Sequence, residues 1–503
     1  MDANVALIII VVYFAVLFVI SLLTSKKADA QTFFSGNKTS PWYVVAFGMV
    51  GATLSGVTFI SVPGAVGNSL WSYFQFVLGN LVGYGVIALV LMPLYYRLNL
   101  VSIYGYLKER FGPSSYKTGA SFFILSRIIG ASLRVYLVVL VLQLFIFDDF
   151  DVPFGVTVLI SIALIYLYTF RGGIKTVVWT DTLQTFFILL AAGITVYVIS
   201  SELNLSLGGL ISTLQESSYT NTWVWDLNAG NNFWKQFFSG MAITIVMVGL
   251  DQDMMQKNLT IKTLGDAQKN MAWFSVAFVL ANILFLSLGA LLYIYGEQMG
   301  IVETAFHVED CEKIMIKDIT SGEMMCMKTD QLFPLLAKNY LGATAAVVFL
   351  LGVIAAAYSS ADSALTALTT SFCVDILGFM EGEEEKNQVQ TRNLVHVGFS
   401  IVLFMVILAF NLLNDDAVVW GIFKAAGYTY GPLLGLYAFG LYTKWQVKDR
   451  LVPLVTIICP LLSYAIHYYS PTLIGYTFGF EILILNGLLT FIGLWLIRNG
   501  KVE

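Results

Sequence analysis

Apolar runs of membrane-spanning length recur along nearly the whole chain. An α-helix needs about 20 apolar residues to cross the hydrocarbon core of a bilayer, and these runs have that length. The pattern predicts an all-α membrane protein with about thirteen transmembrane helices in a single domain, residues 1–503. The predicted spans lie near residues 4–24, 42–67, 71–97, 117–147, 153–170, 176–200, 233–256, 268–295, 340–372, 392–413, 417–443, 450–469 and 475–497.

The second span contains residues that interrupt a helix. Glycines, hydroxyl side chains and a proline crowd residues 48–64. Such a span can unwind near the middle of the membrane, where its free carbonyl groups line a cavity. Residues 240–249 of the seventh span, five spans further on, show a weaker version of the same pattern. Two broken helices in these positions favour two inverted five-helix repeats.

A row of polar side chains runs through the ninth span. Ser359, Asp362, Ser363, Thr366 and Thr370 share one helical face, because residues three, four and seven positions apart stack. Hydrocarbon does not solvate a carboxylate, so this face is expected to line a polar cavity. A row of hard oxygen ligands suits a small hard cation. Packing of small hydroxyl side chains between helices is the competing explanation for the serines.

Asp181 is a second carboxylate within a predicted span. It lies about 6 residues inside the sixth span, roughly 9 Å deep at about 1.5 Å per residue. Counting places Asp181 and Asp362 in the inner half of the membrane, so both side chains can belong to one ion pathway. The alternative is an ion pair of Asp181 with Lys175 or Arg171 near the interface.

Cationic residues also fall within the predicted spans. Arg127 and Arg134 lie in the fourth span and Lys424 in the eleventh. Intramembrane cations bind anionic solutes or serve as counter-ions. Each of these residues can therefore bind the solute or form a structural ion pair with a carboxylate such as Asp181 or Asp362.

Further polar residues lie near the ends of spans. Tyr73 and Gln75 belong to an aromatic segment and are candidates for the solute pocket. Asp251 and Asp253 are expected at the inner end of the seventh span. They can gate the inner exit there, or be solvated or paired with Lys257.

Composition and charge exclude several classes of protein. The chain is 58% hydrophobic and only 12% charged, with a net charge of −5, which is about half the charged fraction of a soluble protein. It has no basic patch for nucleic acid and no phosphate-binding loop for an ATP-driven pump. Its three histidines are scattered, so no metal cluster is predicted. We expect a transporter rather than an enzyme.

Basic residues alternate between the predicted loops and set an orientation. If the N-terminus is outside, the inner loops hold Lys26, Lys27, Arg97, Lys108, Arg110, Lys117, Arg171, Lys175, Lys257, Lys262, Lys444, Lys448, Arg450, Arg498 and Lys501. Lys and Arg favour cytoplasmic loops, so we predict a multi-pass protein of the cell membrane with a cytoplasmic C-terminus. This orientation places Cys311 and Cys326 in one outer loop, where a disulfide between them is predicted.

Several motifs resemble the sodium/solute symporter family over about residues 4–450. This family includes bacterial sialic acid, galactose and proline carriers and animal iodide, monocarboxylate and multivitamin carriers. The most specific motifs are the broken segment 51–64, residues 172–184 and residues 356–360, and residues 57–63 and 102–111 are similar to the monocarboxylate and iodide branch. The resemblance implies a leucine-transporter-type fold with a leading helix, two repeats and two trailing helices. Their predicted ranges are 4–24, 42–200, 233–443 and 450–497.

The resemblance also implies sodium sites. The family's shared site uses carbonyl groups at the helix break and a carbonyl and two hydroxyls further on, which correspond to Gly51, Leu54, Ala356, Ser359 and Ser360. The sialic acid carriers have a second site, which corresponds to Asp181, Ser359, Asp362 and Ser363. Asp362 stands where those relatives use a serine. Its carboxylate either strengthens a second ion site or pairs with a fixed cation that abolishes the site.

The same likeness implies a solute site at the break, with Thr53, Ser55 and Thr58 as candidates, and Arg127 or Arg134 in place of a carboxylate-binding arginine. We expect a sodium-coupled symporter that imports a small polar organic solute by alternating access. An organic anion such as a sialic acid or monocarboxylate is favoured, and a sugar is the alternative. A proton-coupled carrier and a solute-binding membrane sensor are the rival mechanisms. The expected partners are sodium, the solute and the lipid bilayer, with a monomer as the transport unit.

Overall fold

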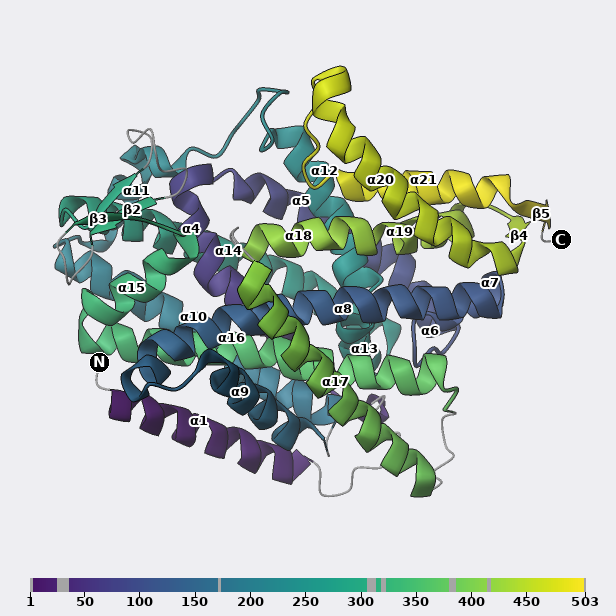
Figure 1. Ribbon diagram of the computed structural model, residues 1–503, viewed down its shortest axis with the longest axis horizontal. Coiled ribbons are helices and arrows are strands. Elements are labelled where there is room, and N and C mark those ends of the chain that lie inside the picture. Colours follow the sequence, from purple (N-terminus) through teal and green to yellow (C-terminus); the bar gives the residue numbers. More distant parts are fainter. Residues whose placement is uncertain are drawn as a thin grey trace.

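Long helices run side by side along the longest axis of the molecule (Figure 1). The computed structural model describes residues 3–24, 36–170, 173–304, 314–317, 323–379, 386–413 and 418–501. Among these, eight helices are long and apolar enough to cross a membrane, or up to ten if each of two bent pairs forms one span. Three further apolar helices are shorter. An all-α membrane protein is therefore confirmed, while the count of thirteen spans stays a prediction.

The described helices are α1 (Ala3–Thr24), α3 (Trp42–Thr53), α4 (Gly56–Ser69), α5 (Tyr73–Val86), α6 (Met92–Arg97), α7 (Gly105–Arg110), α8 (Pro113–Leu142), α9 (Phe154–Thr169), α10 (Gly173–Glu202), α11 (Leu207–Glu216), α12 (Phe233–Thr244), α13 (Gln252–Leu259), α14 (Leu264–Gln298), α15 (Leu332–Asn339), α16 (Gly342–Ser371), α17 (Lys386–Leu413), α18 (Val418–Thr429), α19 (Gly431–Tyr442), α20 (Val452–Ile474) and α21 (Ile482–Leu496). The strands are β1 (Val302–Thr304), β2 (Ile314–Lys317), β3 (Met324–Met327), β4 (Trp445–Val447) and β5 (Arg498–Lys501).

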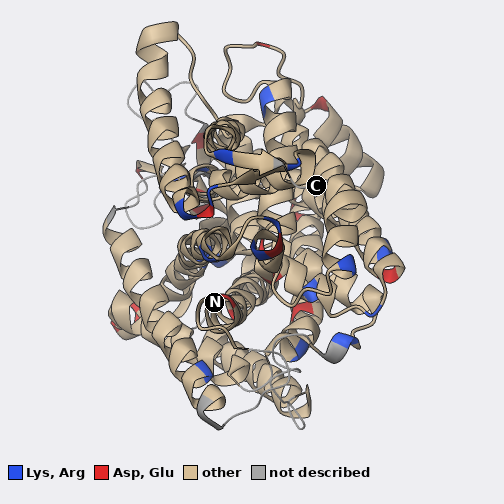
Figure 2. Ribbon diagram, turned by 90° about the vertical axis from the view of Figure 1, so that its right-hand side faces the viewer, with Lys and Arg blue, Asp and Glu red and all other residues tan. Residues whose placement is uncertain are grey.

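Two short antiparallel sheets lie outside the helical bundle. Strands β1, β2 and β3 form one sheet in that order, and β4 pairs with β5. The three-stranded sheet lies at the end of the bundle where α1 begins, and β4 and β5 lie at the opposite end with the C-terminus (Figure 1). Seen from that C-terminal end, Lys and Arg lie on several helix ends and loops (Figure 2).

Both helices predicted to be broken are broken. Helices α3 and α4 meet at a bend of 53°, and α12, extended by a π-helical turn to Gly249, meets α13 at 62°. At the first break the helix stops at Thr53 and restarts at Gly56. The last carbonyl groups of α3 and the first N–H groups of α4 then lack the partners of a continuous helix. Each break thus leaves polar backbone inside the bundle.

The polar face of α16 lies at the centre of the molecule. Helix α16 packs against α10, α8, α3 and α13, and residues 352–371 on it are buried, including Asp362 and its serine neighbours. Large apolar side chains of the outer helices, such as Ile8, Leu89 and Leu461, are exposed instead. Exposed apolar surface on long helices suits contact with lipid. The bundle is polar at its centre and apolar at its rim.

Candidate ion and solute sites

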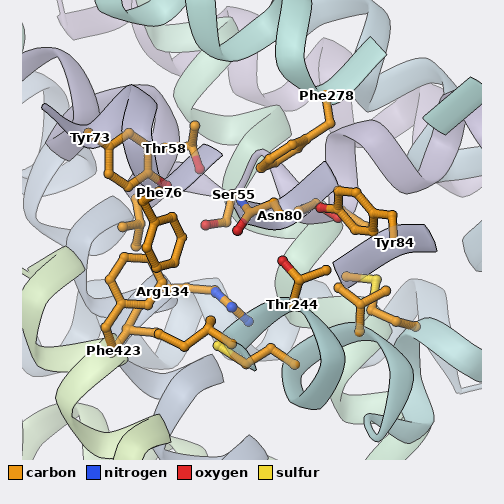
Figure 3. A pocket seen from close by; sticks show the side chains of 18 of the residues that line it. Ser55, Thr58, Tyr73, Phe76, Asn80, Tyr84, Arg134, Thr244, Phe278 and Phe423 are labelled. Carbon is orange, nitrogen blue, oxygen red and sulfur yellow. The ribbon is translucent and has the colours of Figure 1, made fainter. Parts of the chain in front are cut away.

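A cavity lies beside the α3–α4 break. It is enclosed by the break together with α5, α8, α12, α14 and α18 (Figure 3). The centres of water molecules can occupy about 90 Å³ of it, against the 10–15 Å³ that one water requires. Its polar lining comprises Thr53, Ser55, Thr58, Tyr73, Asn80, Tyr84, Arg127, Arg134 and Thr244. Phe76, Ile422 and Phe423 contribute an apolar wall.

The two arginines of α8 have different surroundings. Arg127 is buried and forms ion pairs with Asp253 and, at 3.7 Å, with Asp251. Arg134 forms no ion pair with any residue that the structure describes, and its Nε has no hydrogen-bond partner there. Its guanidinium extends into the cavity, which Ser55 and Thr244 also line (Figure 3). Arg134 is therefore the cation that remains available to a solute.

Most of the predicted solute residues meet at this cavity. Thr53, Ser55, Thr58, Tyr73, Arg127 and Arg134 line it. Gln75 does not, because its amide accepts from the N–H of Val224 at 3.1 Å and donates to the carbonyl of Asn231 at 3.0 Å. Lys424 does not line it either, and its side chain is exposed.

Sequence reasoning missed several lining residues. Asn80, Tyr84 and Thr244 face the cavity together with Tyr73 and Phe76. On α5 the signal was present, since positions 73, 76, 80 and 84 recur at helical spacing and place these side chains on one face. An asparagine within an apolar span is also unusual.

Polar groups of α16 reach the first break. The Ser360 hydroxyl lies 3.4 Å from the carbonyl oxygen of Ala52 and 3.3 Å from that of Ala356. The N–H of Gly51 donates to Thr185 Oγ1 at 2.9 Å, which fixes α3 against α10. Carbonyl and hydroxyl oxygens lie close together here. Among the described residues, no Lys or Arg side chain pairs with these oxygens. This set of hard oxygen donors fits a sodium ion.

Asp181 already has a cationic partner. Its Oδ1 accepts from Ser359 at 2.6 Å, and its Oδ2 lies 3.5 Å from the Ser363 hydroxyl. The same Oδ2 lies 2.8 Å from Nζ of Lys257, which is almost fully buried. The alternative that paired Asp181 with Lys175 is wrong, and Arg171 lies outside the described residues. Lys257 was expected near the inner end of a span, and the bend between α12 and α13 carries it inward.

Asp362 has different hydrogen-bond partners from Asp181. Its Oδ2 accepts from Tyr168 at 3.0 Å and Thr180 at 3.3 Å, and its Oδ1 accepts from the backbone N–H of Ser363 at 2.6 Å. Neither Arg127 nor Arg134 pairs with it, so the alternative that paired Asp362 with one of these arginines is wrong; Arg127 pairs with other carboxylates. Hydrogen-bond donors from α9, α10 and α16 compensate this carboxylate instead.

Asp251 and Asp253 lie at the second break rather than at the end of a span. Both are fully buried. The Asp251 carboxylate caps α13 by accepting from the N–H groups of Asp253 at 2.9 Å and Met254 at 3.4 Å. It also accepts from the Tyr430 hydroxyl at 2.5 Å. Pairing with Lys257 was one of the alternatives for these acids, and Asp253 lies 3.8 Å from Nζ of Lys257.

The predicted disulfide is only partly within the described residues. Cys326 is disulfide-bonded, and Cys311 lies outside the described residues. Cys373 and Cys459 are buried and free. The pairing of Cys311 with Cys326 stays a prediction.

A bundle with two broken helices, an oxygen-rich break and an adjacent cavity defines a secondary transporter of ions and solutes. Residues 33–448 match the model of the sodium:solute symporter family, and the chain belongs to that family. It is a multi-pass membrane protein of a family of transporters, and its coupling ion is Na⁺.

Curated relatives and solved structures agree with this assignment. The chain is 25% identical over 452 residues to the sodium/sialic acid symporter SiaT of Proteus mirabilis, covering 86% of this chain and 83% of the relative. It is 23% identical to the human sodium/iodide cotransporter, covering 84% of this chain and 63% of the relative. A solved Na⁺-coupled sialic acid symporter in a substrate-bound outward-open state has the same fold, with a TM-score of 0.78, 19% identity, and coverage of 99% and 97%.

Proposed function

We propose that this protein imports a small organic anion together with sodium, and that Arg134 binds the carboxylate of the solute. The observation that carries the proposal is a cationic side chain that enters the cavity without an acidic partner among the described residues. A guanidinium offers parallel N–H donors that match a carboxylate. A neutral solute would leave its charge buried and uncompensated, which is costly.

The walls of the cavity support a solute with one polar and one apolar side. Ser55, Asn80 and Thr244 supply groups that exchange hydrogen bonds with hydroxyl or amide groups, while Phe76 and Phe423 cover the opposite side (Figure 3). Relatives named as sialic acid and monocarboxylate symporters carry organic anions of this kind. A neutral sugar is the alternative, since the same polar groups suit its hydroxyls.

We propose that the first sodium ion is held where α16 meets the α3–α4 break. The candidate ligands are the carbonyl oxygens of Gly51, Leu54 and Ala356 and the hydroxyls of Ser359 and Ser360. Ala52 and Thr53 line the solute cavity beside this break. Sodium that orders the break therefore raises the affinity for solute, and solute raises the affinity for sodium equally. One sodium ion moving inward across about 100 mV releases about 2.3 kcal/mol for uptake.

The proposed organisation is two inverted repeats, residues 42–200 and 233–443, which alternate access around the breaks. A leading helix precedes them and two helices follow, with one chain as the transport unit. The outer side carries the N-terminus and the cytoplasmic side the C-terminus. The two ends of the chain lie at opposite ends of the bundle, as this proposal requires (Figure 1).

Uptake into proteoliposomes tests the proposal. A panel of sialic acid, short monocarboxylates and neutral sugars is offered with and without an inward sodium gradient. We expect sodium-driven uptake of an organic anion. Arg134→Gln should raise its half-saturation concentration roughly 10–100-fold, the effect of a charge-assisted hydrogen bond of about 1.5–3 kcal/mol. Arg134→Lys keeps the charge and is the matched variant, with a smaller loss. Sodium-driven sugar uptake that is insensitive to Arg134→Gln would overturn the proposal, as would uptake driven by a proton gradient alone.

A further inference from the structure

A chain of buried charged side chains connects the solute cavity to Asp181. It begins at Arg127, which lines the cavity and pairs with Asp253. Asp253 is 3.8 Å from Nζ of Lys257, one helical turn further along α13. Lys257 in turn pairs with Asp181 on α10. Positive and negative side chains thus alternate from the solute cavity, past the α12–α13 break, to Asp181.

The ammonium group of Lys257 lies where a second coupling cation would bind. Asp181, Ser359 and Ser363 are three of the four residues predicted to ligate a second sodium ion, and both serine hydroxyls lie within 3.5 Å of the Asp181 carboxylate. Lys257 Nζ is 2.8 Å from the Asp181 oxygen that Ser363 also faces. Ser359 donates to the other oxygen. Both carboxylate oxygens therefore have partners without a metal ion.

We propose that Lys257 is a tethered cation that takes the place of a second sodium ion, so that each solute is coupled to a single sodium. A sodium ion at Asp181 would lie beside the ammonium group that already contacts its Oδ2, and two adjacent positive charges repel. A side-chain cation is never released to the cytoplasm and so adds no ion to the stoichiometry. The inference rests on the proposed first sodium site but not on the identity of the solute.

Removal of the Lys257 charge should open the second site. Lys257→Met keeps a long unbranched side chain of similar volume but leaves Asp181 without a cation. The free carboxylate and the hydroxyls of Ser359 and Ser363 are then hard ligands for sodium. Lys257→Arg retains the charge and is the matched control. The double variant Lys257→Met with Asp181→Asn removes both charges and should not recruit the ion.

Sodium-dependent thermal unfolding of the purified protein in lipid nanodiscs counts the ions without any solute. Each ion that binds only the folded state stabilises it in proportion to the logarithm of its concentration once the site is saturated. Sodium is varied against N-methylglucamine at constant ionic strength. The slope of the free energy of unfolding against the logarithm of the sodium concentration then gives the number of ions bound. For the wild type and Lys257→Arg we expect a slope equivalent to one ion. The slope should roughly double in Lys257→Met and return to the wild-type value in the double variant.

Two results would overturn the inference. One is a wild-type slope equivalent to two sodium ions, and the other is a folded Lys257→Met protein whose slope is unchanged. If Lys257→Met does not fold, the wild-type ion count decides the question alone. If sodium does not stabilise the wild type at all, the proposed first site is refuted instead. If Arg134→Gln does not change the half-saturation concentration for uptake, only the proposed solute is refuted.

Discussion

Ser359 and Ser360 are neighbours on α16 with different partners. The hydroxyl of Ser360 faces the carbonyl oxygen of Ala52 at the break, while that of Ser359 donates to the Asp181 carboxylate. A ligand to sodium must turn a lone pair toward the ion, and Ser360 is already placed among carbonyl oxygens. The two serines should therefore contribute unequally to the proposed first sodium site.

Ser360→Ala should raise the half-saturating sodium concentration for uptake roughly fivefold to tenfold, as expected when a polar contact of about 1–1.5 kcal/mol is lost. Ser359→Ala should have a smaller effect, and the double variant should exceed both. Thr369→Val is a suitable control. Thr369 lies nine residues beyond Ser360 on the same helix. It is therefore on the opposite face, where it contacts His396 instead. Unchanged sodium dependence in the double variant would remove both serines from the site.

Residue types alone identified much of the polar centre. The serine and aspartate face of α16, Asp181 and Arg134 all stood out because polar groups in apolar spans require a partner. Their pairing could not be predicted. Lys257 is 76 positions from Asp181 in the sequence, and only the 62° bend before α13 brings its side chain to α10.

At the level of elements, the contact between α5 and α12 forms one wall of the cavity. Glycines allow this contact. A Cβ atom on Gly240 would overlap the carbonyl oxygen of Phe76, and one on Gly79 would overlap that of Phe237. The backbones therefore touch directly, as is common where membrane helices pack through small residues. This close approach brings the side-chain amide of Asn80 to 2.9 Å from Oγ1 of Thr244 at the wall of the cavity.

Gly240→Ala should destabilise the protein by roughly 1–3 kcal/mol, because the added methyl group meets rigid backbone and the helices must separate. Gly85→Ala, on α5 but away from the contact with α12, is the matched control, since nothing lies within 4 Å of the added atom. Alanine there should be neutral or slightly stabilising, by up to about 1 kcal/mol. Thermal unfolding in detergent measures both. Equal unfolding temperatures for the two variants would contradict the packing argument.

The lengths of the apolar runs predicted the helices well where these helices are continuous. It also located both broken helices, because glycine and hydroxyl residues interrupt the apolar pattern. Asp251 and Asp253 lie at the second of these breaks, and Asp253 pairs with Lys257, one of the alternatives that the sequence left open. After Gly249 the sequence becomes polar, with Asp251, Gln252 and Asp253, and the direction of the helix changes by 62°. Side-chain depth in such a span cannot be obtained by counting residues.

At the scale of the whole molecule, the two ends of the bundle differ in chemistry. The start of α1 and strands β1 to β3 lie at one end, and β4, β5 and the C-terminus lie at the other (Figure 1). Lys and Arg side chains occur at the second end (Figure 2). Arg498 begins β5, Lys448 follows β4, and Arg110 donates to the carbonyl oxygen of Trp445 in β4. Lys and Arg favour the cytoplasmic side, so the end with β3 should face outward.

The cysteines provide a test of this orientation. Cys326 in β3 is disulfide-bonded, whereas Cys373 and Cys459 are buried and free. With four cysteines in the chain, a bridge to Cys311 leaves two thiols, so alkylation in denaturant without reductant should add two groups by intact mass and four after reduction.

In intact cells, a membrane-impermeant reductant followed by an impermeant maleimide should label only Cys311 and Cys326, because disulfides persist in oxidising compartments. Cys311→Ser with Cys326→Ser is the control and should remain unlabelled. Four alkylated thiols before reduction would exclude the bridge, while labelling that requires permeabilised cells would reverse the orientation.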